Sequence, residues 1–346
     1  MKGAFFLGSR TFEVRELEER PLAPDEVRIR VMACGVCGTD VHIYHGEPGS
    51  AEVMPPVVLG HEYAGIITEA GTGVDSLSVG DHVTVDPNIY CGSCDPCRTG
   101  RKQFCQHLEA LGVTRNGGFA QSSIAPASQC FKLPPDLPFT AGAMAEPLAC
   151  CLHGVGSADI RPGNTVCIVG GGAIGLLMVQ LARLSGAAHV VLSEPVPMRR
   201  DAGLTLGADI AVDPTRHDLA EVVRSVSGRS GADVVIECVG RSEAARSALE
   251  GAGFGATILL FSVPAPDAAI PLPLFDVYKK ELTVRGSFIN PDTHQWAVDL
   301  LSARRVNIEP IVTHTFDLCR MEEAILMQMS NDSIKVMVLP NGAASV

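Results

Sequence analysis

Residue types that bind zinc stand close together between Cys37 and Glu62. Cys37 follows a strand-like stretch, and His61 and Glu62 come directly after Gly60. A thiolate, an imidazole and a carboxylate together suit a zinc ion that keeps one position open for substrate. We therefore predict that Cys37, His61 and a carboxylate hold a catalytic zinc, on a short loop and a turn.

Four further cysteines are spaced C-x2-C-x2-C-x7-C. Two-residue spacings let successive thiolates turn toward one ion, and four of them complete a closed tetrahedral shell. The alternative is a set of unrelated buried cysteines, but the intervening Gly92, Asp95 and Pro96 are typical of a loop. We predict a structural zinc site made of Cys91, Cys94, Cys97 and Cys105.

A glycine-rich turn lies between a strand-like run at 164–169 and a helical pattern at 176–185. In this context Gly170 permits the tight turn, Gly172 lets the backbone approach a pyrophosphate, and Gly175 permits close helix–strand packing. The N-terminus of the helix would meet the phosphate charge with free N–H groups. We predict a dinucleotide site here that includes the neighbouring Ala173 and Ile174.

The residues after the next strand bear on which dinucleotide binds. Glu194 lies where a carboxylate hydrogen-bonds the ribose 2′-hydroxyl and repels a 2′-phosphate, which favours NAD over NADP. Arg199 and Arg200 leave NADP open, because an arginine there could pair with a 2′-phosphate. The other interpretation of the two arginines is solvated residues on a helix, and Arg199 remains a candidate cofactor contact.

The pattern of predicted secondary structure divides the chain into two parts. Residues 1 to about 90 contain short β-branched runs such as 26–32, without helical patterns between them, which predicts an antiparallel or barrel-like β domain. From about 155, strand and helix patterns alternate, which predicts a parallel sheet wound on both faces. After about 290 the alternation ends, and we expect this tail to return to the first domain.

Composition excludes several classes of partner. The chain has 346 residues, enough for roughly two domains. Its net charge of −12, without a basic run, argues against nucleic acid and anionic membranes. No apolar run approaches the ~20 residues of a membrane helix, and the N-terminus does not resemble a signal peptide. Twelve cysteines, several at metal spacing, favour reduced thiolates and a cytoplasmic location.

These motifs in this order resemble the zinc-dependent medium-chain alcohol and polyol dehydrogenases along essentially the whole chain. The runs 145–148 (Ala-Glu-Pro-Leu) and 286–288 (Gly-Ser-Phe) are similar to the sorbitol dehydrogenase branch. The resemblance implies a GroES-like catalytic domain, residues 1–153 with 290–346, which binds two zincs. It implies a Rossmann dinucleotide-binding domain over residues 154–289.

The resemblance also implies an activity: a zinc-bound secondary alcohol of a polyol loses its proton and passes a hydride to NAD, giving a ketose. Thr39 would pass the proton onward, and His42 is either the next step of this relay or a surface histidine. Asp40 would orient His61. Glu62 and Glu146 compete for the remaining zinc position, and both stay candidates.

Three alternatives remain beside a polyol substrate. One is L-threonine 3-dehydrogenase, which the run 38–44 resembles equally, and another is a different zinc-dependent secondary alcohol dehydrogenase. A non-enzymatic zinc and dinucleotide sensor is disfavoured, because a sensor need not keep a proton relay. Ile289 and Asn290 stand where many sorbitol-type enzymes carry an arginine, which puts sorbitol itself in doubt. Relatives suggest a homotetramer or a homodimer.

Overall fold

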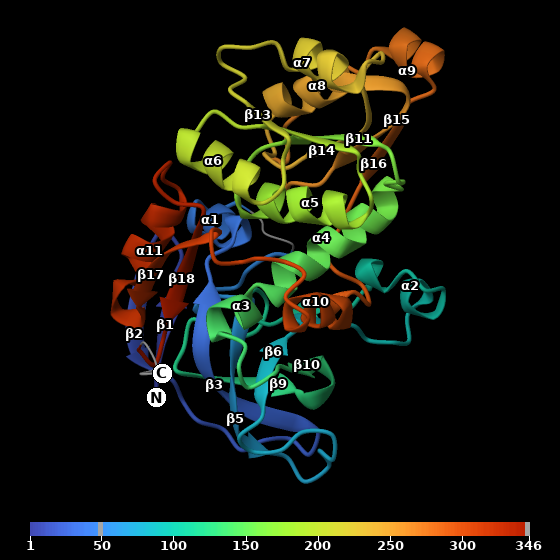
Figure 1. Ribbon diagram of the computed structural model, residues 1–346. Coiled ribbons are helices and arrows are strands. Elements are labelled where there is room, and N and C mark those ends of the chain that lie inside the picture. Colours follow the sequence, from blue (N-terminus) through green and yellow to red (C-terminus); the bar gives the residue numbers. More distant parts are fainter. Residues whose placement is uncertain (48–50, 343–346) are drawn as a thin grey trace. The chain divides into compact units, whose positions relative to one another are not determined.

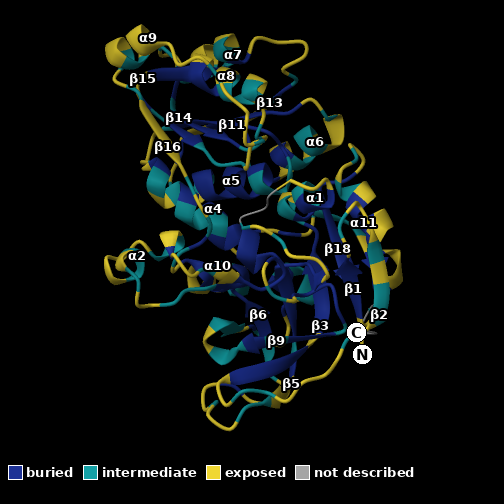
Figure 2. Cartoon of the chain, turned by 180° about the vertical axis from the view of Figure 1, so that it is seen from behind, coloured by how far each residue is buried: buried dark blue, intermediate teal, exposed yellow. Residues whose placement is uncertain are grey.

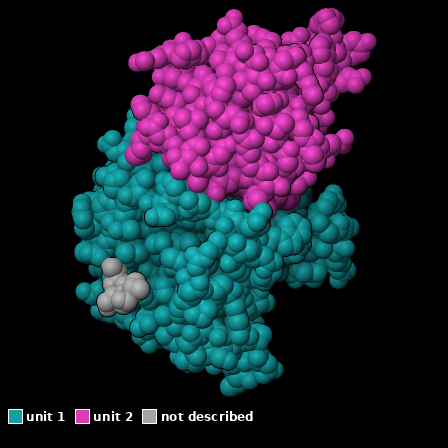
Figure 3. All heavy atoms as spheres, in the orientation of Figure 1, with its two compact units in different colours: residues 1–149, 290–346 teal, residues 150–289 magenta. Residues whose placement is uncertain are grey.

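The computed structural model describes residues 1–47 and 51–342 and divides the chain into two compact units (Figure 3). Unit 1 comprises residues 1–149 and 290–346, and unit 2 comprises residues 150–289. The first boundary falls inside helix α4 (Ala145–Ala158), at residue 149 where the sequence predicts 153. Each unit has its own sheet and its own buried core.

Unit 1 is organised around β3 (Glu26–Gly35), a strand in the middle of a seven-stranded sheet. The strand order is β10-β6-β5-β3-β18-β17, and β9 also pairs with β3. Every pair is antiparallel, as predicted, except that β17 and β18 run parallel. Parallel neighbours need a crossover, which η3 (Leu318–Arg320) and α11 (Met321–Gln328) supply here. The sheet contains β5 (Glu62–Ala70), β6 (His82–Val85), β9 (Ser122–Pro126), β10 (Cys130–Lys132), β17 (Val312–Asp317) and β18 (Lys335–Leu339).

The two faces of β3 are both covered. Val27, Ile29 and Val31 lie on one face and are fully buried, as their alternation predicts. On the opposite face the side chain of Arg28 is also buried, and its Nε donates to Glu69 Oε2 at 2.9 Å. Apart from Arg30, which is exposed, the strand is buried on both faces up to its carboxyl end, where the predicted zinc ligands begin.

The helix α1 (Gly38–Tyr44) begins two residues after β3 ends, and Cys37 lies in this short connection. Cys37 and Asp40 form a capping box, in which each side chain meets the backbone N–H of the other. Glycine and β-branched residues are weak helix formers, and they hide this short helix from a reading of local propensity. The capping box stabilises the first turn of α1, which its helix propensities alone would not do.

The remaining elements of unit 1 form two small sheets and short helices. One sheet contains β1 (Lys2–Phe6), β2 (Phe12–Glu16) and β4 (Val57–Val58), and the other contains β7 (Asn88–Ile89) and β8 (Glu109–Ala110). The helices are α2 (Asp95–Arg98), η1 (Lys102–Phe104), η2 (Ala127–Gln129), α3 (Phe139–Ala143), α10 (His294–Ser302), η3 (Leu318–Arg320) and α11 (Met321–Gln328).

Unit 2 contains a six-stranded sheet in the order β13-β12-β11-β14-β15-β16, with every pair parallel. Helices α5 and α6 cover one face and α7 and α8 the other (Figure 1). The predicted doubly wound sheet is confirmed, and its order is that of a dinucleotide-binding fold. Its strands are β11 (Thr165–Val169), β12 (His189–Ser193), β13 (Ile210–Val212), β14 (Ala232–Glu237), β15 (Ala252–Leu260) and β16 (Thr283–Gly286). Its helices are α5 (Ala173–Leu184), α6 (Pro197–Thr205), α7 (Leu219–Ser227), α8 (Ser242–Gly251) and α9 (Leu274–Lys280).

Burial is uneven within unit 2. Figure 2 shows the inner strands β11 and β14 buried, whereas α9 is exposed. The edge strand β16 is exposed along its whole length. Within residues 1–47 and 51–342, the helices are all too short or too polar to cross a bilayer.

Candidate functional site

The first three predicted zinc ligands come together at the ends of two paired strands of unit 1. Cys37 is the N-cap of α1, just beyond β3, and Glu62 is the first residue of β5. Because Gly35 of β3 pairs with Glu62 in the antiparallel ladder, the two strand ends meet. One ligand atom from each of Cys37, His61 and Glu62 lies within 4.8 Å of the others.

The turn that presents His61 depends on Gly60. Its backbone has φ +91°, and a Cβ there would lie 2.7 Å from the Cys34 sulfur and 2.9 Å from the Phe119 ring. Only glycine accepts both the positive φ and this close packing. The run at 60–62 therefore places an imidazole and a carboxylate side by side in a buried position.

Asp40 connects two of the candidate ligands. Its Oδ2 accepts a hydrogen bond from the backbone N–H of Cys37 at 2.8 Å, and its Oδ1 lies 3.7 Å from His61 Nδ1. Burial lowers the pKa of His61, but the charges of Asp40 and Cys37 outweigh burial and raise it well above its usual value. A cation is thus favoured at this histidine, whether a proton or a metal ion.

The donor set fits zinc. Among the described residues, His61 Nδ1 is a buried polar atom that lacks a hydrogen-bond partner, since Asp40 Oδ1 lies 3.7 Å away. A buried polar atom without a hydrogen-bond partner destabilises the fold unless a bound ion interacts with it. One sulfur, one nitrogen and one carboxylate oxygen within 4.8 Å match a zinc site with an open fourth position.

Glu146, the competing carboxylate, lies in the first turn of α4 and is buried. It is not part of the group of three ligand atoms within 4.8 Å, although its charge helps to raise the pKa of His61. Glu62 is thus the carboxylate that the structure gathers with Cys37 and His61, and Glu146 is a nearby charge.

A residue that sequence reasoning missed lies against Glu62. Lys335 of β18 is buried, and its Nζ is in direct contact with Glu62 Oε2. Burial lowers the pKa of Lys335, but the charges of Glu62, Cys37 and Asp40 and the hydrogen bond to Glu62 together raise it above its usual value. One signal was available: a lysine inside the apolar run 333–339 is unusual, because lysine is almost never fully buried unless paired.

The two predicted relay residues lie on α1. Thr39 and His42 are three residues apart on this helix and both are partly exposed, so they share one face. His42 Nδ1 is in close contact with Glu47 Oε2. The histidine therefore has an acidic partner near the C-terminus of α1, where both side chains are accessible to solvent.

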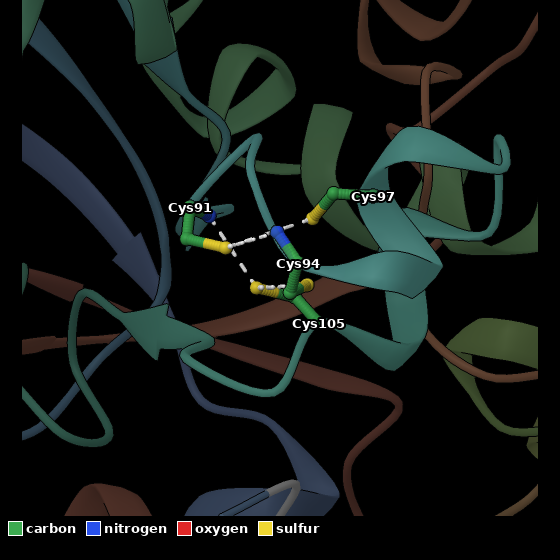
Figure 4. Close-up of side chains that lie close together, drawn as sticks. All are labelled: Cys91, Cys94, Cys97 and Cys105. Carbon is green, nitrogen blue, oxygen red and sulfur yellow. Dashed lines mark hydrogen bonds between the residues drawn. The ribbon is translucent and has the colours of Figure 1, made fainter.

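The four predicted structural cysteines form a compact cluster (Figure 4). The sulfurs of Cys91 and Cys97 are 4.0 Å apart, and those of Cys94 and Cys105 are 3.9 Å apart. Tetrahedral zinc with bonds of about 2.3 Å to sulfur separates its ligands by about 3.8 Å. Hydrogen bonds from the backbone N–H groups of Ser93 and Cys94 lower the pKa of Cys91 to about 5, which favours the thiolate that binds metal.

The glycine turn of unit 2 joins β11 to α5. Gly170 has φ +103°, and a Cβ on Gly175 would lie 1.8 Å from the Gly170 carbonyl oxygen. At Gly172, the N-cap of α5, a Cβ would meet nothing within 4 Å. Ala173 and Ile174 form the first turn of α5. The turn thus leaves open space at Gly172 and none at Gly175.

Glu194 follows β12 and is buried beside the glycine turn. Its Oε2 accepts a hydrogen bond from Gly171 N–H at 2.7 Å, and its Oε1 accepts one from Val196 N–H at 2.8 Å. Arg199 lies on α6, five residues further along. Arg200 is turned to the backbone, donating to the carbonyl oxygens of Glu194 and Pro195 at 2.8 and 2.7 Å. The carboxylate therefore positions the glycine turn.

Comparison with known proteins agrees with this arrangement. Residues 23–135 match the alcohol dehydrogenase GroES-like domain, and residues 173–303 match the zinc-binding dehydrogenase family. A sorbitol dehydrogenase of Bacillus subtilis is 31% identical over 99% of this chain and 98% of that protein. An L-threonine 3-dehydrogenase of Caldanaerobacter subterraneus is 33% identical over 92% of both proteins.

A solved structure is similar along its whole length. A protein of Sinorhizobium meliloti 1021, described as a zinc-binding dehydrogenase and bound to NADP, is 39% identical, with a TM-score of 0.94. The match covers 98% of this chain and 99% of that chain. On this similarity and on the two family matches, the chain belongs to the zinc-dependent medium-chain alcohol and polyol dehydrogenases.

Proposed function

We propose that this chain oxidises a secondary alcohol of a polyol or sugar alcohol to the ketose, with zinc and NAD. The observation that carries the proposal is the buried group of Cys37, His61 and Glu62, whose ligand atoms lie within 4.8 Å of one another. The sorbitol dehydrogenase relative supports the substrate class. The zinc, when bound, would make the alcohol proton easier to remove.

The residues of this chain then have distinct tasks. Cys37, His61 and Glu62 would hold the metal, and Asp40, whose Oδ1 lies 3.7 Å from His61 Nδ1, would support His61. Thr39 takes the alcohol proton and passes it toward His42, whose contact with Glu47 gives the proton an exit to solvent. Glu146 would add negative charge near the metal site, and it is the second candidate for the carboxylate ligand.

The two units have different roles in this proposal. Unit 1 is the zinc-binding catalytic domain, and its cysteine cluster holds a structural zinc that is closed to substrate because all four positions are thiolates. Unit 2 is the dinucleotide-binding domain, with the pyrophosphate at Gly172, Ala173 and Ile174 at the N-terminus of α5. Orientation of the nicotinamide for hydride transfer is the contribution of this unit.

NAD is the proposed cofactor because Glu194, directly after β12, supplies a carboxylate that would repel a 2′-phosphate. NADP is the second candidate, since the Sinorhizobium relative is bound to it and Arg199 lies five residues beyond Glu194. Initial rates with each cofactor distinguish them. A higher kcat/KM with NADP than with NAD would overturn the assignment of Glu194.

The substrate class is tested by a panel of polyols, amino alcohols and simple alcohols, with NADH formation as the readout. Oxidation of at least one polyol is expected. The second candidate substrate is L-threonine, because threonine dehydrogenases are among the relatives. Turnover of threonine without turnover of any polyol would replace the polyol proposal, and no turnover of any alcohol would favour a sensor.

A homodimer or homotetramer is proposed on one observation. The edge strand β16 is exposed, and the neighbouring α9 exposes Leu274, Phe275 and Tyr278 by 73%, 69% and 80%. An unpaired strand edge beside large apolar side chains is suited to a second copy of the chain. A monomer in analytical ultracentrifugation would contradict this. We also place the protein in the cytoplasm, where thiolates that bind zinc stay reduced.

A further inference from the structure

A buried lysine lies inside the candidate metal centre of unit 1. The side chain of Lys335 is 4% exposed and that of Glu62 is 1% exposed, and their charged atoms are in direct contact. The charges of Cys37 and Asp40 also act on the lysine. The ammonium is therefore a fixed cation among three groups that can be negative.

The backbone is built to admit this ion pair. β3 lies between β5 and β18, and Gly35 of β3 pairs with Glu62 on one side and with Met337 on the other. A Cβ on Gly35 would lie 2.2 Å from Glu62 Oε2 and 2.9 Å from Lys335 Cε. The two side chains thus meet over the middle strand at the one point where it carries no side chain.

Stability alone does not account for the pair. Replacing a buried ion pair by apolar residues of similar volume is often neutral or stabilising, because taking both charges out of water is costly. An apolar residue at 335 would also continue the pattern of the strand, whose neighbours Val336 and Val338 are fully buried. The lysine is better explained by what it does to Glu62.

We propose that Lys335 is a positioning residue that competes with the catalytic zinc for the carboxylate of Glu62. When Glu62 Oε2 faces Lys335 it is held back from the metal, and a ligand position is left for the alcohol. When the carboxylate turns to the metal, Lys335 loses its partner, so neither arrangement is strongly favoured. This inference rests on the proposed function for its zinc, and it adds control of the open position.

The first test is Lys335→Met, which keeps the length of the side chain and removes the charge. Without its competitor Glu62 should stay on the metal, and zinc release to pyridylazoresorcinol should slow by about tenfold, the scale on which groups around a ligand change metal affinity. The release phase of this zinc is identified by its absence in Cys37→Ala. The phase of the four-cysteine zinc should not change.

Cobalt substitution gives a second readout that does not depend on turnover. The visible spectrum of Co²⁺ reports its ligands, so Lys335→Met should show the spectrum of a site with a bound carboxylate. Glu62→Gln should show a different one. Lys132→Met is a matched control, because Lys132 belongs to the same unit but pairs with Asp81 at the surface. It should leave both the spectrum and zinc release as in wild type.

A double-mutant cycle separates competition from simple repulsion between Lys335 and zinc. In a Glu62→Gln background there is no carboxylate to compete for, so Lys335→Met should change zinc release by less than about threefold. The double variant buries no charge at either position, so it also serves if Lys335→Met alone does not fold.

Two results would overturn the proposal. One is wild-type zinc release and cobalt spectrum in Lys335→Met. The other is an equal effect of this substitution with glutamate and with glutamine at position 62. If the wild-type chain oxidises no alcohol, the proposed function fails, while the cycle on zinc release still decides the role of Lys335.

Discussion

The Nδ1 atom of His61 lies 3.7 Å from the Oδ1 atom of Asp40, and both side chains are buried in unit 1. The other oxygen of Asp40 accepts from the backbone of Cys37. One carboxylate thus lies beside two candidate ligands, at ion-pair distance from the ring of His61 and hydrogen-bonded to the main chain of Cys37.

Asp40→Asn tests this relationship. The amide keeps the shape but removes the charge that favours a cation at His61, so zinc affinity at this site should fall by about 10–100-fold. Zinc content after dialysis against a chelator is the measurement. The expected loss is one zinc per chain, and a variant that retains both would show that Asp40 does not act on the metal.

The two zinc sites should respond differently to the loss of one thiolate. Cys37→Ala should remove one zinc and all turnover, with little change in Tm. Cys94→Ala should remove the other zinc and lower Tm by on the order of 10 °C, because structural zinc contributes directly to folding. Metal analysis and thermal unfolding check both. Full turnover in Cys37→Ala would refute the mechanism.

Asp86 should make stability depend on pH. Burial raises the pKa of its carboxyl to about 6, against about 3.9 in an unfolded chain. Between these values the folded chain holds a proton that the unfolded chain has lost, so stability falls as pH rises from about 4 to about 6. Asp86→Asn does not titrate. Its free energy of unfolding should therefore rise relative to that of wild type across this window, by on the order of 2 kcal/mol.

Asp81→Asn is the control for this prediction. A hydrogen bond from Lys132 lowers the pKa of Asp81, so its contribution is present above the unfolded pKa and is lost as pH falls through the lower folded value. The sign is opposite to that at Asp86. Urea unfolding is measured from pH 4 to 7, a range above the titration of Asp81. Asp81→Asn should keep the wild-type fall in stability and Asp86→Asn should remove it, and equal slopes in the two variants would contradict the assignment.

The elements of the fold could be predicted because their signals are local. The pattern at 176–185 predicts a helix and forms most of α5 (Ala173–Leu184), and the run 164–169 predicts a strand and forms β11 (Thr165–Val169). The glycine turn and the cysteine cluster were predictable for the same reason, since each lies within one short segment. A metal site whose ligands all come from one loop has a recognisable spacing in the sequence.

The candidate metal centre could be predicted only in part, because its members come from distant strands. The contact between Lys335 and Glu62 depends on β3 pairing with both β5 and β18, which no strand pattern specifies. Choosing between Glu62 and Glu146 likewise required the ladder that sets Glu62 opposite Gly35. Long-range register is therefore what the sequence alone left open.

Glu194→Gln should shift cofactor preference. The amide oxygen can still accept one backbone hydrogen bond, but the charge that would repel a 2′-phosphate is gone. The ratio of kcat/KM for NADP to that for NAD should rise by about tenfold, the scale of one hydrogen bond to a charged group. Glu237→Gln is a matched control, because Glu237 ends β14 and also accepts two backbone N–H groups. That variant should leave the ratio unchanged.

Substitutions at Gly172 and Gly175 should affect different properties, cofactor binding at the first position and stability at the second. A Cβ at Gly175 would lie 1.8 Å from the Gly170 carbonyl oxygen, so Gly175→Ala should lower Tm because β11 and α5 must move apart. At Gly172 a Cβ meets no protein atom within 4 Å, and φ is −69°, so Gly172→Ala should keep the wild-type Tm. The added methyl should instead occupy the space that the pyrophosphate approaches, which weakens NADH binding at least about tenfold. Tight NADH binding by Gly172→Ala would show that the dinucleotide does not lie against this turn.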